Sequence, residues 1–121
     1  MLFRSFFDSE IGRRILCSEQ VWREFRFSLM TDVRELLKEE TEEEKILLQG
    51  VVDCCFLENG ELVLLDYNTD GVFSDSEIKE RSEHYRIQLE TYAGALERIF
   101  GCRVKERWLY FLRPETAVAL T

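Results

Sequence analysis

The chain has 121 residues, of which 45% are hydrophobic and 33% charged, and its formal net charge is -8. This length and balance predict one globular domain with a core of its own, and no apolar run approaches the roughly 20 residues of a membrane-spanning helix. The acidic charge argues against a free-standing nucleic-acid binder, because DNA phosphates are neutralised by basic surfaces.

The compartment is predicted from the start of the chain and from its cysteines. The apolar residues of the first segment are followed at once by Asp8, which is not typical of a signal peptide, and we expect a cytoplasmic protein. Four cysteines have no metal-binding spacing, and we expect them to be reduced core residues. They are Cys17, Cys54, Cys55 and Cys102.

A short helix is predicted near the start. Asp8 or Ser9 can cap it, and it ends near Cys17. Its buried side consists of Ile11, Ile15 and Leu16.

The next segment favours a strand. Residues 21–29 alternate apolar and polar side chains, which is typical of a half-buried strand. Residues 31–37 favour a capped turn of helix, and the glutamates between residues 39 and 44 indicate a solvated acidic loop.

A hairpin is predicted in the middle of the chain. Two apolar runs, residues 47–57 and 61–68, lie on either side of Asn59-Gly60. Asn-Gly is the strongest short-range signal for a two-residue type I′ turn, because both of its residues need a positive φ. Such a turn pairs Glu58 with Glu61 and fixes the register of both strands.

This register brings two carboxylates together. It places Asp53 opposite Asp66 and Val51 opposite Asn68, and opposed residues have Cβ atoms roughly 4.5 to 5.5 Å apart. Two like charges on an otherwise apolar face must be paired, neutralised or bound to a metal. A divalent cation is the simplest remedy, and the alternative is that both aspartates cap strand ends or pair with buried arginines.

The second half predicts a long helix and two strands. Ser74 and Glu77 have capping-box spacing, the helix reaches about Phe100, and Gly101 ends it. Its buried stripe consists of Tyr85, Leu89, Tyr92, Ala93, Leu96 and Ile99. Residues 104–112 and 116–120 then favour strands.

Three segments together resemble the RecB-like branch of the PD-(D/E)XK nucleases: Gly50-Val51-Val52-Asp53, Asp66-Tyr67-Asn68-Thr69-Asp70 and Gln88-Leu89-Glu90-Thr91-Tyr92. The similarity runs from about Phe6 to Leu120 and points to the carboxy-terminal nuclease domain of the A subunit of bacterial AddAB-type helicase-nucleases. It implies an α/β PD-(D/E)XK (restriction-endonuclease-like) core, in which helices flank a mixed central sheet. Residues 1–121 would form a single nuclease-like domain, a C-terminal fragment of a larger helicase-nuclease.

The resemblance also implies a metal site. Asp53 and Asp66 would bind Mg²⁺ or Mn²⁺, with the backbone carbonyl of Tyr67 as a further oxygen ligand, and hard oxygen ligands suit both ions. Glu24 resembles a family glutamate that helps the metal or its water, although a surface glutamate beside two arginines is the alternative for this residue.

Two residues of the long helix are implied to contact DNA. Gln88 and Tyr92 are four residues apart and therefore share a helix face. The family motif places such a pair at the active site, where it contacts DNA phosphate. Without the resemblance, Tyr92 would be a core residue and Gln88 an exposed helix former.

One position departs from the family. Asn68 stands where the family has Lys, and Asn can donate a hydrogen bond but carries no charge. Losing one such catalytic donor typically slows an enzyme on the order of 10²- to 10³-fold. The family's metal-binding histidine lies far upstream of this segment, and His84, the single histidine, is expected at the surface.

The implied function is Mg²⁺-dependent hydrolysis of phosphodiesters in single-stranded DNA, impaired here by Asn68. The parent would be an exonuclease and helicase for double-strand-break repair and recombination, and its helicase domains would be partners together with a second subunit. The alternative is a catalytically inactive module that binds DNA or a partner protein. A third possibility is an acidic interaction domain with no role on DNA.

Overall fold

The computed structural model describes residues 6–32, 44–69, 74–112 and 115–120. Within these ranges a helix, three strands, a long helix and two strands follow one another, which confirms the predicted order. The elements are α2 (Glu10–Cys17), β1 (Val21–Asp32), β2 (Lys45–Glu58), β3 (Glu61–Asn68), α4 (Asp75–Phe100), β4 (Val104–Phe111) and β5 (Thr116–Ala119).

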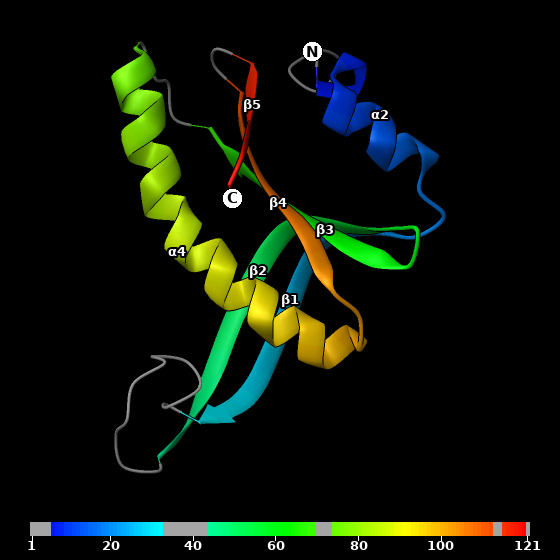
Figure 1. Cartoon of the computed structure of the whole chain (residues 1–121), viewed down its shortest axis with the longest axis vertical. Helices are drawn as coiled ribbons and strands as arrows, with labels where there is room; N and C mark the ends of the chain where they lie inside the picture. The colour runs from blue at the N-terminus through cyan, green and yellow to red at the C-terminus, as the bar shows by residue number, and fades with distance from the viewer. Residues whose placement is uncertain (1–5, 33–43, 70–73, 113–114, 121) are drawn as a thin grey trace.

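The five strands form one mixed sheet in the order β1-β2-β3-β4-β5. Only β3 and β4 run parallel, and α4 connects them, whereas the other neighbours are antiparallel. Figure 1 shows α4 lying diagonally across the sheet, and the paired β1 and β2 extending past it. The expectation of a mixed sheet with flanking helices is therefore confirmed.

Each face of the sheet buries its own core. On one face, Ile11 and Ile15 of α2 pack against Phe56, Leu65 and Tyr110. On the opposite face, α4 packs through Leu96 against Val52, Cys55, Leu62 and Leu64. Leu89 of α4 extends this second core toward Leu109, Phe111 and Leu120. These buried side chains hold β2 and β3 in fixed positions between the two helices.

The helix ends follow the predicted chemistry. The Ser74 hydroxyl accepts a hydrogen bond from the Glu77 N–H at 3.2 Å, and Gly101 ends α4 with a φ of 70°. At the start of α2, the Ser9 hydroxyl accepts from the Gly12 N–H at 3.1 Å. Each side chain satisfies an N–H that the first turn of a helix leaves without a backbone partner.

Several local predictions are wrong. Leu16 and Ile99 are 65% and 41% exposed, because each lies at the edge of its helix's apolar face rather than on it. Thr31 and Asp32 belong to β1, where pairing with β2 overrides the predicted helical turn, and residues 33–43 lie outside the described ranges. Cys17 is exposed, so the prediction that it is a core residue is wrong, whereas Cys54 and Cys55 are buried as predicted.

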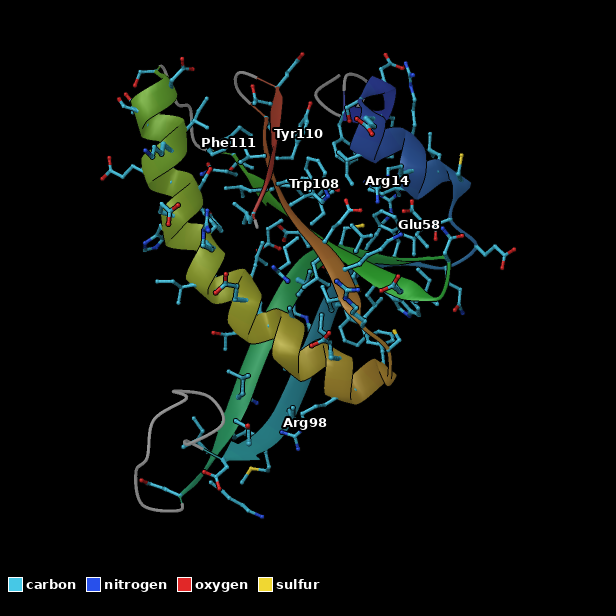
Figure 2. All side chains as sticks on the ribbon, viewed as in Figure 1. Arg14, Glu58, Arg98, Trp108, Tyr110 and Phe111 are labelled. Carbon is cyan, nitrogen blue, oxygen red and sulfur yellow. The ribbon has the colours of Figure 1, made fainter. Side chains whose placement is uncertain are left out.

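A polar cluster fixes α2 to the sheet. The Arg14 guanidinium donates to Glu58 at 2.9 and 2.7 Å and to Glu106 at 2.8 and 2.9 Å. Lys105 also donates to Glu58 at 2.8 Å, and the Trp108 ring N–H donates to Glu106 at 2.7 Å. Figure 2 shows Arg14 and Glu58 meeting beneath α2.

In the part of the chain that the structure describes, no helix is long and apolar enough to cross a membrane.

Candidate metal and DNA site

The central hairpin has the predicted turn. Asn59 and Gly60 have φ values of 54° and 80°, as a type I′ turn requires. The ladder pairs Glu58 with Glu61 and continues in that register to Cys54 and Leu65. The predicted register is confirmed over these five residue pairs.

Beyond Cys54 and Leu65, β2 and β3 separate. Val51 pairs with Arg26 of β1, whereas Asn68 pairs with Phe111 of β4. The ladder between β2 and β3 includes no pair beyond Cys54 and Leu65, so the prediction that Val51 lies opposite Asn68 is wrong. The physical reason is that each strand follows its other neighbour past this point, which leaves a split in the sheet.

Asp53 and Asp66 lie at the apex of this split. The Asp53 N–H donates to Oδ1 of Asp66 at 3.0 Å, and the Tyr67 N–H donates to Oδ2 of Asp53 at 2.9 Å. Each carboxylate thus accepts an N–H at the point where the ladder between the two strands stops. This is the strand-capping role considered above, and it leaves Oδ1 of Asp53 and Oδ2 of Asp66 outside these two hydrogen bonds.

The environment of Asp66 disfavours its charge. The residue is 5% exposed, and burial raises the pKa of its carboxyl to about 6. The N–H of Asp53 lowers this pKa, whereas the negative charge of Asp53 raises it. At neutral pH the fold therefore contains a buried anion beside a second carboxylate, an arrangement that a bound cation would relieve.

Two carboxylates are the type of ligand that a hard divalent cation takes. Mg²⁺ is often bound through one or two carboxylates while it keeps several waters. Within the described ranges, no group of three His, Cys, Asp or Glu residues is arranged to hold a metal, so Glu24 does not complete such a set with Asp53 and Asp66. Asp70 of the family motif lies outside the described residues.

Glu24 occupies an unusual position in the middle of β1. The residue is exposed, and its φ of 50° lies in the left-handed region. By the register of β1 and β2 it falls opposite Asp53. Its implied role toward the metal stays a prediction.

Asn68 is enclosed by the fold. It is 2% exposed, and its backbone carbonyl accepts a hydrogen bond from the Leu112 N–H at 3.1 Å. Strand alternation places Asn68 and Asp66 on the same face as Leu62 and Leu64, which is the face that α4 covers. The position that holds Lys in the resembled family is therefore directed to the same side as Asp66.

Gln88 and Tyr92 lie together on α4. The Gln88 amide donates to the Tyr92 hydroxyl at 3.2 Å. The Tyr92 ring packs edge-on against Phe27, with ring centroids 5.0 Å apart, so its aromatic part contributes to the core. Gln88 is exposed. Both roles considered for Tyr92 are thus compatible, because the ring is packed while the hydroxyl meets a polar neighbour.

The role of Gly50 was not predicted from the sequence. A Cβ built on Gly50 would lie 2.6 Å from Cζ of Tyr92 and 2.8 Å from Cζ of Phe27. The absence of a side chain therefore allows Tyr92 to approach β2. A glycine inside a strand is the signal that could have indicated this close approach.

The remaining candidates lie elsewhere. His84 is exposed on α4, as predicted. A groove of about 720 Å³ runs between α4 and the ends of β1 and β2, with Leu29, Leu48 and Arg98 in its lining. Asp53 and Asp66 are not among its lining residues, so the groove is separate from the carboxylate pair.

The chain is similar to a segment of much longer bacterial proteins. It is 44% identical over 108 residues to the A subunit of the ATP-dependent helicase/nuclease of Thermoanaerobacter sp. (strain X514), covering 87% of this chain and 9% of that protein. The identity to the protein of the same name is 40% over 120 residues in Clostridium kluyveri and 42% over 119 residues in Clostridium botulinum (strain Hall). These matches cover 96% and 95% of this chain.

The chain therefore spans about a tenth of the length of these curated relatives. At this identity over most of its residues, it is homologous to one segment of the helicase/nuclease A subunit. No protein-family model matches the chain.

Proposed function

We propose that this chain is the PD-(D/E)XK nuclease domain of an ATP-dependent helicase/nuclease. The observation that carries the proposal is the meeting of Asp53 and Asp66 at the split between β2 and β3. The homology to a segment of the helicase/nuclease A subunit supports it independently. The substrate would be single-stranded DNA, and the reaction would be hydrolysis of its phosphodiesters.

Asp53 and Asp66 would hold Mg²⁺ or Mn²⁺, with the carbonyl of Tyr67 as a third oxygen ligand. When bound, the ion would supply positive charge and an activated water at the scissile phosphate. The two carboxylates would act as its ligands, and their N–H partners fix them at the split. A bound cation would offset the negative charge that burial disfavours at Asp66.

The neighbouring side chains would position the DNA strand. Gln88 and Tyr92 offer an amide and a hydroxyl, which can donate hydrogen bonds to phosphate oxygens. Asn68 can donate a hydrogen bond on the Asp66 side but supplies no charge, so the chain is an impaired nuclease in this proposal. The parent protein would act in the cytoplasm, in double-strand-break repair and recombination, and its partners would be its own helicase domains and a second subunit.

A second candidate function is favoured by Asn68 itself. Without the family's lysine, the same fold would serve as a catalytically inactive module that binds DNA or a partner subunit. The two candidates differ in what restoring the lysine does. A gain of turnover supports the nuclease, whereas unchanged inactivity with intact metal binding supports the module.

The test is digestion of end-labelled single-stranded DNA in Mg²⁺. We expect the unmodified chain to act near background and Asn68→Lys to gain on the order of 10²-fold or more. Fusing Asn68→Lys to the segment that precedes the homologous region in the relatives should increase the rate further. Asp66→Asn in the Asn68→Lys background is the matched control and should abolish the gain. Robust digestion by the unmodified chain would contradict the proposed impairment.

A further inference from the structure

The ladder between β1 and β2 is interrupted at one position. Every pair from Val21 and Phe56 to Asp32 and Lys45 keeps the same register, and Glu24 is the one residue of β1 without a pair. Its expected partner in this register is Asp53. Because the register is identical on both sides, the interruption is a local distortion of both strands and not an inserted residue.

The distortion changes which face the side chains occupy. Trp22 and Phe25 both contact the ring of Phe100 on α4, with centroids 4.8 and 5.1 Å apart. Residues three apart point to opposite faces in a regular strand, so β1 must turn between them. On β2, Val52 and Cys55 likewise both pack into the α4 core. At the level of Glu24 and Asp53, both strands therefore reverse which face of the sheet their side chains occupy.

The backbone of Glu24 accounts for the turn. A φ of 50° is disfavoured for a residue with a Cβ, and Gly is the residue that adopts it readily. At this same level, Asp53 leaves the β1 ladder and makes its hydrogen bonds with Asp66 and Tyr67 of β3. Such disfavoured backbone conformations are concentrated at functional sites.

We propose that Glu24 is a positioning residue for the carboxylate pair, and that it acts through its left-handed backbone rather than through its carboxylate. The left-handed turn in β1 releases Asp53 from β1 and directs it toward β3. The inference deepens the proposed function. Only its consequence for metal binding rests on that function, whereas the effect of Glu24 on the hydrogen bonds of Asp53 does not. It also differs from the role that the resemblance implies, in which the Glu24 carboxylate assists the metal.

Four substitutions at Glu24 separate the role of the backbone from that of the side chain. Glu24→Gly removes the carboxylate and favours the left-handed conformation, whereas Glu24→Gln removes the charge alone. Glu24→Val disfavours the left-handed conformation, and Glu24→Ala does so more mildly if the valine variant does not fold. Ser28→Val, at an exposed and regularly paired position of β1, controls for a branched side chain on this strand.

The first measurement is hydrogen exchange of the Asp53 and Tyr67 amides by NMR, which requires no metal. We expect Glu24→Gly and Glu24→Gln to retain the protection of both amides. Glu24→Val should accelerate their exchange by about tenfold or more, and Ser28→Val should not. Unchanged exchange in Glu24→Val, or equal acceleration in Glu24→Gln, would overturn the inference.

The second measurement is Mn²⁺ binding by calorimetry. We expect Glu24→Gly and Glu24→Gln to bind within about threefold of the unmodified chain, and Glu24→Val to bind about tenfold more weakly. Equal losses in Glu24→Gly and Glu24→Gln would assign the role to the carboxylate and overturn the proposal. If the amides respond as expected but no form binds Mn²⁺, the positioning role stands and the proposed metal site is wrong.

Discussion

At the scale of single residues, the fold tolerates an unfavourable charge at Asp66. Its pKa of about 6 lies above the ordinary value of 3.8 because the carboxyl is buried. Between about pH 4 and pH 6, the folded chain therefore holds a proton that the unfolded chain has released. Stability due to this group is complete below pH 4 and falls as the pH rises to 6, by about 3 kcal/mol at most.

Asp66→Asn should remove this pH dependence. The amide oxygen of Asn can still accept the Asp53 N–H, while the charge is lost. In the presence of a chelator, we expect a higher melting temperature than the unmodified chain at pH 7 and a similar one at pH 4. Glu19→Gln, at an exposed position, is the control for losing one negative charge. Equal destabilisation by Asp66→Asn at both pH values would contradict the burial penalty.

Alanine substitutions at two glycines test whether Tyr92 packs closely against β2. Gly50→Ala places a Cβ against the Tyr92 and Phe27 rings, and such overpacking costs about 1–3 kcal/mol. Gly94 lies inside α4, and a Cβ there has nothing within 4 Å, so Gly94→Ala should stabilise by about 0.5–1 kcal/mol. Chemical denaturation measures both. Changes of the same sign would show that Tyr92 does not approach β2 as described.

At the scale of elements, the position of α2 depends on the shared guanidinium of Arg14. Hydrogen bonds from Arg14 and Lys105 lower the pKa of Glu58 to about 2. A lowered carboxyl pKa contributes stability above its ordinary value of 4.5, and this contribution is lost as the pH falls toward 2. Because the Glu58 side chain is 28% exposed, solvent screening reduces the contribution.

Arg14→Met should weaken the attachment of α2 to the sheet. It keeps the length of the side chain but removes the donors to Glu58 and Glu106, and we expect a loss on the order of 2 kcal/mol at pH 7. Arg13→Met on the same helix is exposed and should change stability little. The difference between the two variants should shrink as the pH falls from 4.5 toward 2. Urea denaturation at several pH values measures it, and a constant difference would contradict the role of Glu58.

The elements also show which features sequence reasoning could reach. Asn59-Gly60, Ser74 and Gly101 act within a few residues, so the turn and both ends of α4 were predictable from local chemistry. The hairpin register followed from that turn and placed Asp53 near Asp66. The split between β2 and β3 was not predictable, because it depends on pairing with β1 and β4.

The other features that were missed are equally non-local. Arg14 meets Glu58 across 44 residues and Glu106 across 92 residues of sequence. The left-handed backbone of Glu24 has no local signal, since glutamate rarely adopts it. Tertiary pairing therefore decides the geometry of the candidate site, while local chemistry decides where its elements begin and end.

At the scale of the whole molecule, net charge opposes the proposed substrate. The chain carries -8, and Gln88 and Tyr92 offer hydrogen bonds and aromatic surface rather than positive charge. Long-range repulsion lowers the concentration of DNA near an acidic surface. In the proposed parent protein, other segments would have to hold the strand while this domain contacts it.

Isolated binding of single-stranded DNA should therefore be weak and dependent on metal. We expect a Kd weaker than about 10⁻⁴ M at physiological salt, the weak end of non-specific binding. Mg²⁺ should strengthen binding more than Na⁺ at equal ionic strength, because a divalent ion can bridge the Asp53 and Asp66 carboxylates to a phosphate. Fluorescence anisotropy measures both effects, and Gln88→Ala should weaken the Mg²⁺-dependent part. Tyr92→Phe keeps the ring against Gly50 and isolates the contribution of the hydroxyl. Tight binding without metal that is unchanged in Gln88→Ala would place the DNA surface on another part of the molecule.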